Sequence, residues 1–522
     1  MTDLSRASVI NKLRERERYD LIVIGGGATG AGIALDAAAR GYAVALLERE
    51  DFGSGTSSKS SKLVHGGVRY LANGEFSLVR EALHERALLL DNAPHLVEPL
   101  NFVIPAKNLY ERVKYRLGLW LYDQLAGESQ FERSSAVPIS ELRRSMATLR
   151  HEQFSGAVKY ADGLFDDTRL LWDLVHHALR FGANAANYCR VVGLIKRGQR
   201  IAGVEACDQE SGDCFKLHAD AVINATGAWS DEIGALDNPN DNPSVVPSQG
   251  THIVVGREFF PANDALLIPR TRDGRVMFVI PWYNKVVIGT TDEKLARGTT
   301  DAAPKDQEIE LILQTARDYL AHPPERTDIS ACFAGIRPLS AAGGNAKTAK
   351  ISREHAIEVA HSGLITISGG KWTTYRLMAE QCVDTFERVT GRDHLACVTS
   401  NLKLAQQSAA DQYRRYGINS PAIEDLLLAS AALREPLSQQ LAITAGEVIF
   451  ATRHEMARTV MDVLARRTRS LFVDAQAAID LAPRVAELMR AELDQDAQWR
   501  EAQMNNFMQQ AAGFVVDTKT GN

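Results

Sequence analysis

"YDLIVIGGGATGAGIALDAAARGYAVALLERE", at residues 19–50, is the stretch that decides the fold. An apolar run at 21–24 predicts a buried strand, and the glycines after it lead into a helix of small residues that ends near Gly41. A second apolar run at 43–47 predicts another strand. A strand, a helix and a strand in this order are typical of α/β folds with a parallel sheet.

The turn between the first strand and the helix has the spacing Gly25-x-Gly27-x-x-Gly30. The first glycine permits a tight turn, the second lets the backbone approach a pyrophosphate, and the third lets the helix pack on the strand. The helix N-terminus adds partial positive charge, and Glu48 after the second strand is placed to accept hydrogen bonds from a ribose. These features predict a dinucleotide site for NAD or FAD.

Two segments far downstream favour FAD over NAD. "INATGAW", at 223–229, ends an apolar strand with the small residues Ala225, Thr226 and Gly227, which allow a close backbone approach. "SGGKWTTYR", at 368–376, places two glycines before a predicted helix whose N-terminus would point at the flavin edge that becomes negative on reduction. A nucleotide fold split over such distances favours a flavin enzyme over a simple NAD dehydrogenase.

The remaining patterns predict three structural parts. Strand-like runs between 251 and 292 indicate an antiparallel sheet, and beyond about residue 395 the patterns are almost all helical. We predict an α/β fold that has a Rossmann-type FAD-binding domain with an inserted antiparallel-sheet substrate domain, plus an all-helical C-terminal domain. The predicted boundaries are 1–80, 155–235 and 330–390 for the first domain, 81–154 and 236–329 for the second, and 395–515 for the third.

The composition excludes several classes of partner. The chain has 522 residues and a net charge of −6, which gives no reason to expect nucleic acid. The first twenty residues mix charges of both signs and lack the apolar core of a secretory signal. No later run reaches the roughly 18 uninterrupted apolar residues that a membrane span needs. The loop at 237–248 lacks the glycine and glutamate of a calcium loop, and we expect no metal.

The six cysteines show no C-x-x-C spacing, so zinc and thioredoxin-like chemistry are not expected. Cys207 and Cys214 flank "DQESGD" and could face each other across a hairpin. A cytoplasmic protein keeps its thiols reduced, so we predict free cysteines rather than a disulfide there.

The motifs taken together closely resemble one family. In chain order they are "GGGATGAGIALDAAARG", "TSSKSSKLVHGGVRYL", "VINATGAW", "THIVV", "FVIPW", "IGTTDE", "GIRPLS" and "SGGKWTTYR". This series, from about residue 19 to 385, resembles the FAD-dependent (aerobic, respiratory) glycerol-3-phosphate dehydrogenases, and "VLARRTRSLF" resembles their C-terminal domain. The resemblance implies oxidation of sn-glycerol 3-phosphate to dihydroxyacetone phosphate, with electrons passed through FAD to a membrane quinone.

The resemblance also implies which residues form the site. Fixed cations bind a phosphate dianion, and the positions that match are Arg337, Arg353 and Lys371. His252 matches an active-site histidine, and a histidine suits removal of the hydroxyl proton. Arg69 and Tyr70 match residues on the substrate side, and Lys371 is counted with the catalytic group as well. The predicted cofactor contacts are Gly25, Gly27, Thr29, Gly30, Glu48, Thr56, Ser57, Ser61, Lys62, His65, Gly66, Gly67, Ala225, Thr226, Gly227, Gly370 and Thr373.

The segment 107–127, "KNLYERVKYRLGLWLYDQLAG", mixes cations with leucine, tryptophan and tyrosine. That composition suits a helix lying in a membrane interface, and it also suits a helix packed on the inserted sheet. The resemblance favours the first interpretation and implies peripheral binding to the cytoplasmic face of the inner membrane. A homodimer is a further expectation.

Three alternatives to a quinone-linked dehydrogenase stay open. The first is a glycerol-3-phosphate oxidase that uses oxygen. The second is another FAD-dependent oxidase of an amino acid or a 2-hydroxy acid, which would not need all three phosphate-binding cations. The third is a non-catalytic FAD-binding membrane adaptor, which would tolerate loss of His252 and Arg69, and both are present.

Overall fold

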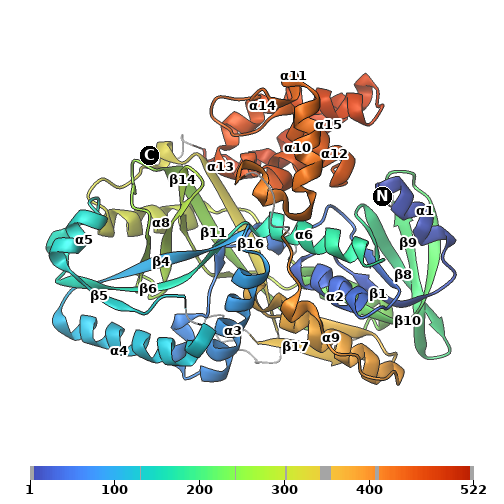
Figure 1. Ribbon diagram of the computed structural model, residues 1–522, viewed down its shortest axis with the longest axis horizontal. Coiled ribbons are helices and arrows are strands. Elements are labelled where there is room, and N and C mark those ends of the chain that lie inside the picture. Colours follow the sequence, from blue (N-terminus) through green and yellow to red (C-terminus); the bar gives the residue numbers. More distant parts are fainter. Residues whose placement is uncertain are drawn as a thin grey trace.

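The structure, a computed structural model, describes residues 5–129, 131–240, 243–299, 302–340, 354–405 and 411–517. Two sheets lie next to each other, and a group of helices from the last part of the chain packs on the second sheet and on a helix that flanks the first (Figure 1). The predicted α/β class with a helical C-terminal part is confirmed.

The first sheet contains the predicted nucleotide-binding unit. Its central strands β18, β10, β1, β2 and β7 run parallel, and β17 pairs antiparallel with β18 at the edge. The strands β8, β9 and β10 also form an antiparallel meander. The strand bounds are β1 Tyr19–Ile24, β2 Val44–Leu47, β7 Asn184–Ala186, β8 Cys189–Arg197, β9 Arg200–Asp208, β10 Cys214–Asn224, β17 His355–Val359 and β18 Ile365–Gly369.

Helix α2 (Ala28–Ala39) packs between α6 (Asp167–Arg180) and α9 (Tyr375–Thr390) beside this sheet. Helix α2 is built largely from alanine and glycine and is buried along most of its length, which lets the neighbouring helices approach closely. Helix α1 (Arg6–Glu15) packs on β7. The predicted strand, glycine turn, helix and strand at 19–50 are therefore confirmed to within a few residues.

The second sheet is the predicted antiparallel one, and it is larger than the sequence indicated. Its order is β15, β11, β14, β13, β12, β4, β6 and β3, with β16 on β11 and β5 on β6. The strand bounds are β3 Leu63–Val64, β4 Val97–Ala106, β5 Ser135–Pro138, β6 Gly156–Phe165, β11 Val245–Gly256, β12 Ala265–Ile268, β13 Met277–Trp282, β14 Lys285–Gly289, β15 Glu293–Lys294 and β16 Ala331–Ser340.

Two long strands of this sheet depart from the predicted boundaries. β6 and β16 lie in stretches that the prediction assigned to the FAD-binding domain, yet each pairs with a strand of the second sheet over its whole length. The helices α3 (Phe76–Asn92), α4 (Leu109–Ala126), α5 (Ile139–Ser145) and α8 (Asp306–Tyr319) accompany this sheet. Helix α7 (Ser230–Asp237) follows β10.

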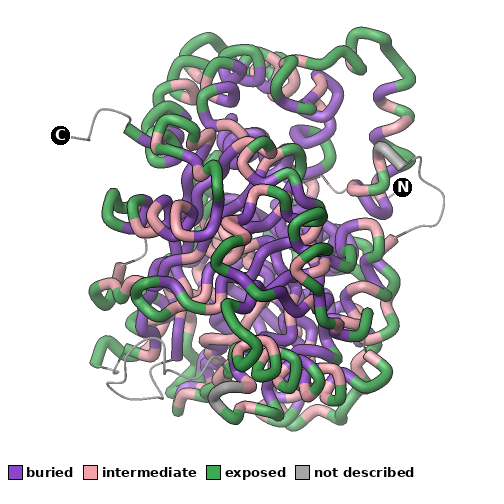
Figure 2. The backbone as a smooth tube through the Cα atoms, turned by 90° about the vertical axis from the view of Figure 1, so that its left-hand side faces the viewer, coloured by how far each residue is buried: buried purple, intermediate pink, exposed green. Residues whose placement is uncertain are grey.

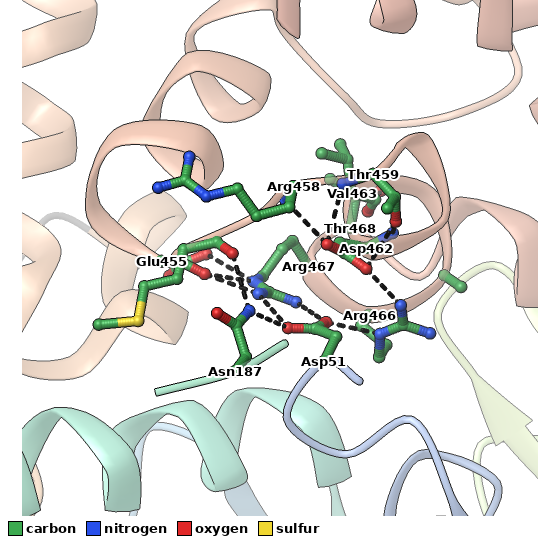
Figure 3. Close-up of polar contacts among 12 residues, drawn as sticks. Asp51, Asn187, Glu455, Arg458, Thr459, Asp462, Val463, Arg466, Arg467 and Thr468 are labelled. Atoms are coloured by element: carbon green, nitrogen blue, oxygen red, sulfur yellow. Dashed lines mark hydrogen bonds and ion pairs between the residues drawn. The ribbon is translucent and has the colours of Figure 1, made fainter. Parts of the chain in front are cut away.

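The C-terminal helices are joined to the rest of the molecule by a buried network of charges. Asp51, in the loop after β2, accepts hydrogen bonds from Arg466 and Arg467 of the π-helical turn Asp462–Arg467 (Figure 3). Arg467 also binds the carbonyl of Glu455. The helix bounds are α10 Ser420–Ala429, α11 Ala431–Arg434, α12 Ala445–His454, α13 Ser470–Val473, α14 Ala475–Glu492 and α15 Ala497–Ala511.

Buried backbone runs through the centre of the molecule, and the exposed segments lie around its rim (Figure 2). Among the described residues, no helix combines the length and the apolar character needed to cross a bilayer.

The prediction of free cysteines is wrong at one pair. Cys207 and Cys214 form a disulfide across the hairpin of β9 and β10, where the two residues stand directly opposite each other with their Cα atoms 4.0 Å apart. The prediction relied on compartment and gave too little weight to register, because facing positions on a tight hairpin bring two side chains within bonding distance. Four other cysteines are free.

Candidate active site

The first cavity lies at the carboxyl ends of β1, β10 and β18 and is called the nucleotide cavity here. Its volume is about 330 Å³. This is where open α/β sheets bind their ligands. The predicted cofactor residues that line it are Gly25, Gly27, Thr29, Glu48, Thr56, Ser57, Ala225, Thr226, Gly227 and Gly370. Segments some 340 residues apart in the sequence therefore meet at one site, as the split nucleotide fold predicts.

The glycine turn fits a dinucleotide for steric reasons. Gly25 has a φ of 105°, and a Cβ there would lie 2.7 Å from the carbonyl oxygen of Ala225. A Cβ on Gly30 would lie 1.8 Å from the carbonyl oxygen of Gly25, so the helix can approach the turn only without a side chain. Helix α2 begins at Ala28 and opens towards the cavity with its N-terminal amides. The residues present thus fit a pyrophosphate-containing cofactor.

Glu48 is half-buried in the wall of this cavity. Burial raises the pKa of its carboxyl to about 7, and the N–H groups of Glu50 and Gly26 oppose that rise by donating hydrogen bonds of 2.8 and 2.6 Å. The carboxylate is therefore fixed in orientation by backbone amides. Its role at an adenosine ribose stays a prediction.

A second cavity of about 750 Å³ lies between the second sheet and α4, and it is called the second cavity here. Its wall has both polar and apolar side chains. The polar residues are Ser61, His65, Arg69, Arg275, Thr290, Thr291, Asp292 and Arg337, and the apolar ones include Phe102, Ile104, Leu119, Leu267 and Phe278. Predicted substrate residues Arg69, Tyr70 and Arg337 thus share one cavity, together with Ser61, His65 and Gly67, which were predicted as cofactor contacts.

Lys371 connects the two cavities. It lines the nucleotide cavity, and its ammonium group lies 4.1 Å from the centre of the Tyr70 ring, which lines the second cavity. Trp372, the next residue, donates an indole hydrogen bond of 2.9 Å to the carbonyl of Ser57. A molecule in the second cavity would therefore lie beside a cofactor in the nucleotide cavity.

The segment between the cavities is held from two sides. Thr373 accepts a hydrogen bond of 3.2 Å from the amide of His65. The amide of Gly66 donates to the Tyr122 hydroxyl and to Asp162, at 3.0 and 3.3 Å. Thr373 and Gly66 were predicted as cofactor contacts, but they do not line the nucleotide cavity and instead fix the backbone beside it. The predicted helix start after Gly370 is a 3₁₀ turn, and α9 begins only at Tyr375.

Arg337 presents its guanidinium group to the second cavity from β16. Its Nη2 donates to the Thr290 hydroxyl at 2.9 Å and to the Thr291 carbonyl at 3.2 Å, and its Nη1 lies 3.6 Å from Asp292. These contacts fix the planar group in position, which suits recognition of a tetrahedral anion. Arg353, the second predicted phosphate ligand, lies outside the described residues.

His252 is buried behind the wall of the second cavity. Its ring stacks on that of Phe333 with the ring centres 4.8 Å apart, and His252 as a whole is 3% exposed. Its Nε2 lies 2.8 Å from the hydroxyl oxygen of Ser61, which does line the cavity. Burial, followed by the nearby cations Arg337 and Lys62, holds the pKa of His252 well below its usual value. The histidine is therefore neutral near pH 7 and reaches the cavity through Ser61.

The prediction that Lys62 contacts the cofactor is not supported by its position. Its ammonium group is fully buried, and it donates to Asp167 at 2.6 Å and to the Ser58 carbonyl at 2.8 Å. The contact that the resemblance implied for this side chain is not made, because a buried carboxylate from α6 pairs with its charge.

Some residues of the second cavity were missed at the sequence level. Thr290, Thr291 and Asp292 lie in "IGTTDE", a segment that signalled the family but received no role. These residues follow β14, and Arg337 lies on β16. Both strands pair with β11, and that pairing brings the three residues close to Arg337. A run of small polar residues directly after a strand was the available signal.

The low pKa of His252 predicts a pH dependence of stability. Below pH about 6.5 the histidine binds a proton in the unfolded chain but not when it is buried in the folded one. The free energy of unfolding therefore falls by up to about 1.4 kcal/mol for each pH unit. We expect His252→Asn to lose less stability than the wild type between pH 6.5 and 5.5, as measured by urea unfolding. The exposed residue His361 provides the control, and equal slopes for wild type and His252→Asn would contradict the burial of a neutral histidine.

Comparisons with known proteins agree with this geometry. Residues 20–376 match the FAD dependent oxidoreductase family, and residues 363–502 match the C-terminal domain of alpha-glycerophosphate oxidase. The mitochondrial glycerol-3-phosphate dehydrogenase of Mesocricetus auratus is 37% identical over 98% of this chain and 75% of its own length. That of Homo sapiens is 36% identical over 96% of this chain and 74% of its own length.

A solved structure supports the same assignment over the whole chain. The glycerol-3-phosphate dehydrogenase from Bacillus halodurans complexed with FAD superposes with a TM-score of 0.81 at 28% identity, covering 99% of both chains. The L-alpha-glycerophosphate oxidase of Mycoplasma pneumoniae, at 16% identity and a TM-score of 0.57, shares the fold over 73% of this chain and 100% of its own. The chain belongs to the FAD-dependent glycerol-3-phosphate dehydrogenases, and FAD is its cofactor.

Proposed function

We propose that the enzyme oxidises the C2 hydroxyl of sn-glycerol 3-phosphate to the ketone of dihydroxyacetone phosphate and passes the electrons to a membrane quinone. One observation carries this proposal. Arg337 and Ser61 line one cavity, the neutral His252 lies behind Ser61, and the ammonium group of Lys371 lies over the Tyr70 ring in the wall of the same cavity. FAD, when bound, supplies the acceptor for the hydride that leaves C2.

Arg337 is proposed to hold the substrate phosphate. Its planar donors suit two phosphate oxygens at once, and Lys371 adds a second cation at the boundary of the two cavities. Arg353 is proposed as a further ligand on the strength of its sequence position alone. A site built on cations selects a phosphorylated substrate over free glycerol because each charge-assisted contact contributes about 1.5 kcal/mol or more.

Ser61 and His252 are proposed to accept the hydroxyl proton. Ser61 lies on the cavity wall, so its oxygen can take the proton of the substrate hydroxyl while its own proton passes to Nε2 of His252, 2.8 Å away. Because its pKa is held low, His252 is unprotonated before the reaction, so its ring can take the role of acceptor. Arg69 and Tyr70 are proposed to orient the glycerol hydroxyls from the same cavity, with Lys371 held over the Tyr70 ring.

Helix α4 is proposed to lie on the cytoplasmic face of the inner membrane. Leu109, Tyr110, Val113, Leu117 and Trp120 are each more than half exposed, which is unusual for a run of large apolar residues on one helix. The cations Lys107, Arg112, Lys114 and Arg116 stand among them and suit anionic lipid. Apolar residues of the same helix, among them Leu117, Leu119 and Leu121, line the second cavity, which supports a quinone as electron acceptor.

The membrane proposal predicts a separable defect. We expect Leu109→Asp with Val113→Asp to lower binding to vesicles of anionic phospholipid at least tenfold, since two apolar side chains are replaced by two negative charges. Neither residue lines a cavity, so reduction of the bound flavin by substrate should be unchanged. Leu428→Asp in α10, at a position that is also 63% exposed, is the control. Equal vesicle binding by the α4 variant and the wild type would refute the docking surface.

The reaction is tested with the purified flavoprotein under anaerobic conditions. Glycerol 3-phosphate should bleach the flavin absorbance, whereas glycerol and amino acids at the same concentration should not. Bleaching by an amino acid would overturn the substrate assignment, and bleaching by none would favour a non-catalytic FAD-binding adaptor. Reoxidation by a water-soluble quinone that is much faster than reoxidation by oxygen would distinguish a dehydrogenase from an oxidase.

A further inference from the structure

Two buried cations from different parts of the chain converge on the same acceptors behind the second cavity. Lys62 donates to the Ser58 carbonyl at 2.8 Å and to Asp167 at 2.6 Å. Arg469, from the start of α13, donates to the same carbonyl at 2.7 Å and lies 3.4 Å from the other oxygen of Asp167. The side chains of Lys62, Asp167 and Arg469 are fully buried. A helix from the C-terminal domain thus reaches the loop that carries Ser61.

The surroundings of this cluster keep the two cations close together. The ammonium group of Lys62 lies 5.3 Å from the ring centres of both Phe333 and Phe472. The guanidinium group of Arg469 lies 3.9 Å from the ring centre of Phe472. Ring faces attract cations and offset part of the repulsion between them. Phe333 is also the ring on which His252 stacks, so the cluster borders the proton-accepting pair directly.

Both cations occupy unfavourable backbone conformations. Lys62 and Arg469 each have a φ of 62°, the left-handed region that residues with a Cβ rarely adopt. Such a conformation persists only where the surrounding contacts compensate for it, and it is frequent at functional sites. Two such residues from separate parts of the chain share the Ser58 carbonyl and the Asp167 carboxylate.

The loop between these anchors holds Ser61. The Ser60 hydroxyl donates to Asp167 at 2.7 Å and accepts from the amide of Lys62 at 3.1 Å. Ser61 lies between these two tethered residues, and its hydroxyl meets His252 at 2.8 Å. Arg466 and Arg467 already join the C-terminal helices to the nucleotide domain by binding Asp51. Arg469 is therefore not needed for that attachment.

We propose that Arg469 and Lys62 are positioning residues that hold the loop 58–62 so that Ser61 faces both the substrate hydroxyl and His252. The C-terminal domain then controls proton acceptance without touching the substrate. This inference rests on the proposed roles of Ser61 and His252, and the positioning itself is a separate claim that can be measured without turnover.

The test uses the full-length flavoprotein with Arg469→Met, which removes the charge and keeps an apolar side chain of similar length. We expect a fall of at least tenfold in the rate of flavin reduction by bound glycerol 3-phosphate, with less than a threefold change in the dissociation constant. Amide hydrogen exchange within 58–62 should become faster in the same variant. Arg469→Lys should recover part of both effects, and the exposed Arg484→Met should change neither.

A double mutant identifies the route of the effect. If Arg469 acts through Ser61, Arg469→Met should slow flavin reduction in the otherwise wild-type protein. In a Ser61→Ala background the same substitution should slow flavin reduction by no more than a further twofold. Normal exchange at 58–62 together with reduction as fast as in Arg484→Met would overturn the proposal. If Arg469→Met does not fold, Lys62→Met and Arg469→Lys are judged by the same two measurements. Faster exchange in Arg469→Met, together with a wild-type flavin that glycerol 3-phosphate does not reduce, would support the positioning and reject the proposed function.

Discussion

Arg337→Ala should raise the KM for glycerol 3-phosphate by about a hundredfold or more. The guanidinium is held by Thr290 and Thr291 and is proposed to make two charge-assisted hydrogen bonds to the phosphate. Contacts of this kind contribute about 1.5 kcal/mol or more each, and a loss of about 3 kcal/mol corresponds to roughly two factors of ten. Steady-state kinetics with an artificial electron acceptor measures the change.

Two comparisons make the Arg337 prediction specific to phosphate. Any residual activity with glycerol should be nearly the same in wild type and Arg337→Ala, because glycerol has no group for the cation to bind. Arg337→Lys should lie between the two enzymes, since it keeps the charge and loses the planar pair of donors. An unchanged KM for glycerol 3-phosphate in Arg337→Ala would show that the phosphate binds elsewhere. Thermal unfolding confirms that the variant is folded.

The nucleotide half of the site was predictable because its signals are local. The turn Gly25–Gly30 and Glu48 lie within one strand–helix–strand unit, where spacing alone fixes geometry. The second cavity was predictable only through the resemblance, since its walls depend on strand register. Ser61 and His252 are 191 positions apart, and no periodicity in either segment indicates that they meet.

The features that the sequence did not predict have a common physical origin. Lys62 and the run of arginines near residue 467 are charged, and charged side chains are usually solvated or directed at ligands. Here they are buried because Asp51 and Asp167 are buried with them, and pairing of this kind cannot be inferred from composition. The boundaries at β6 and β16 failed for a similar reason, since an apolar strand does not reveal which of two sheets it joins.

Asp51→Ala should be among the most destabilising single substitutions in the chain. The carboxylate accepts hydrogen bonds of 2.6 Å from Arg466, 2.6 and 2.9 Å from Arg467, and 3.0 Å from Asn187 (Figure 3). Among the described residues, removing it leaves Arg466 with only Asp462, and Arg467 with only Glu455, to balance two cations buried at the interface between the nucleotide domain and the C-terminal helices. Breaking a buried ion pair from one side costs about 3–5 kcal/mol, which unfolding by urea or heat measures directly.

The same carboxylate predicts how stability changes with pH. Burial alone would raise the pKa of Asp51, but Arg467 and Arg466 hold it below its usual value. The stabilisation is therefore present above the unfolded pKa of about 3.9 and is lost as the pH falls through the lower folded value. The pH dependence of unfolding in acid should be shallower in Asp51→Asn than in the wild type.

A surface pair separates this effect from a general effect of charge. Glu487 pairs with Arg490 on α14 with both side chains about one third to one half exposed, and Glu487→Ala should change the unfolding midpoint little. If Asp51→Ala proves as mild as Glu487→Ala, the C-terminal helices are not held by this network. If Asp51→Ala is severely destabilising, the variant should also lose protection from proteolysis in the C-terminal helices first, because the carboxylate that joins the arginines there to the nucleotide domain is gone.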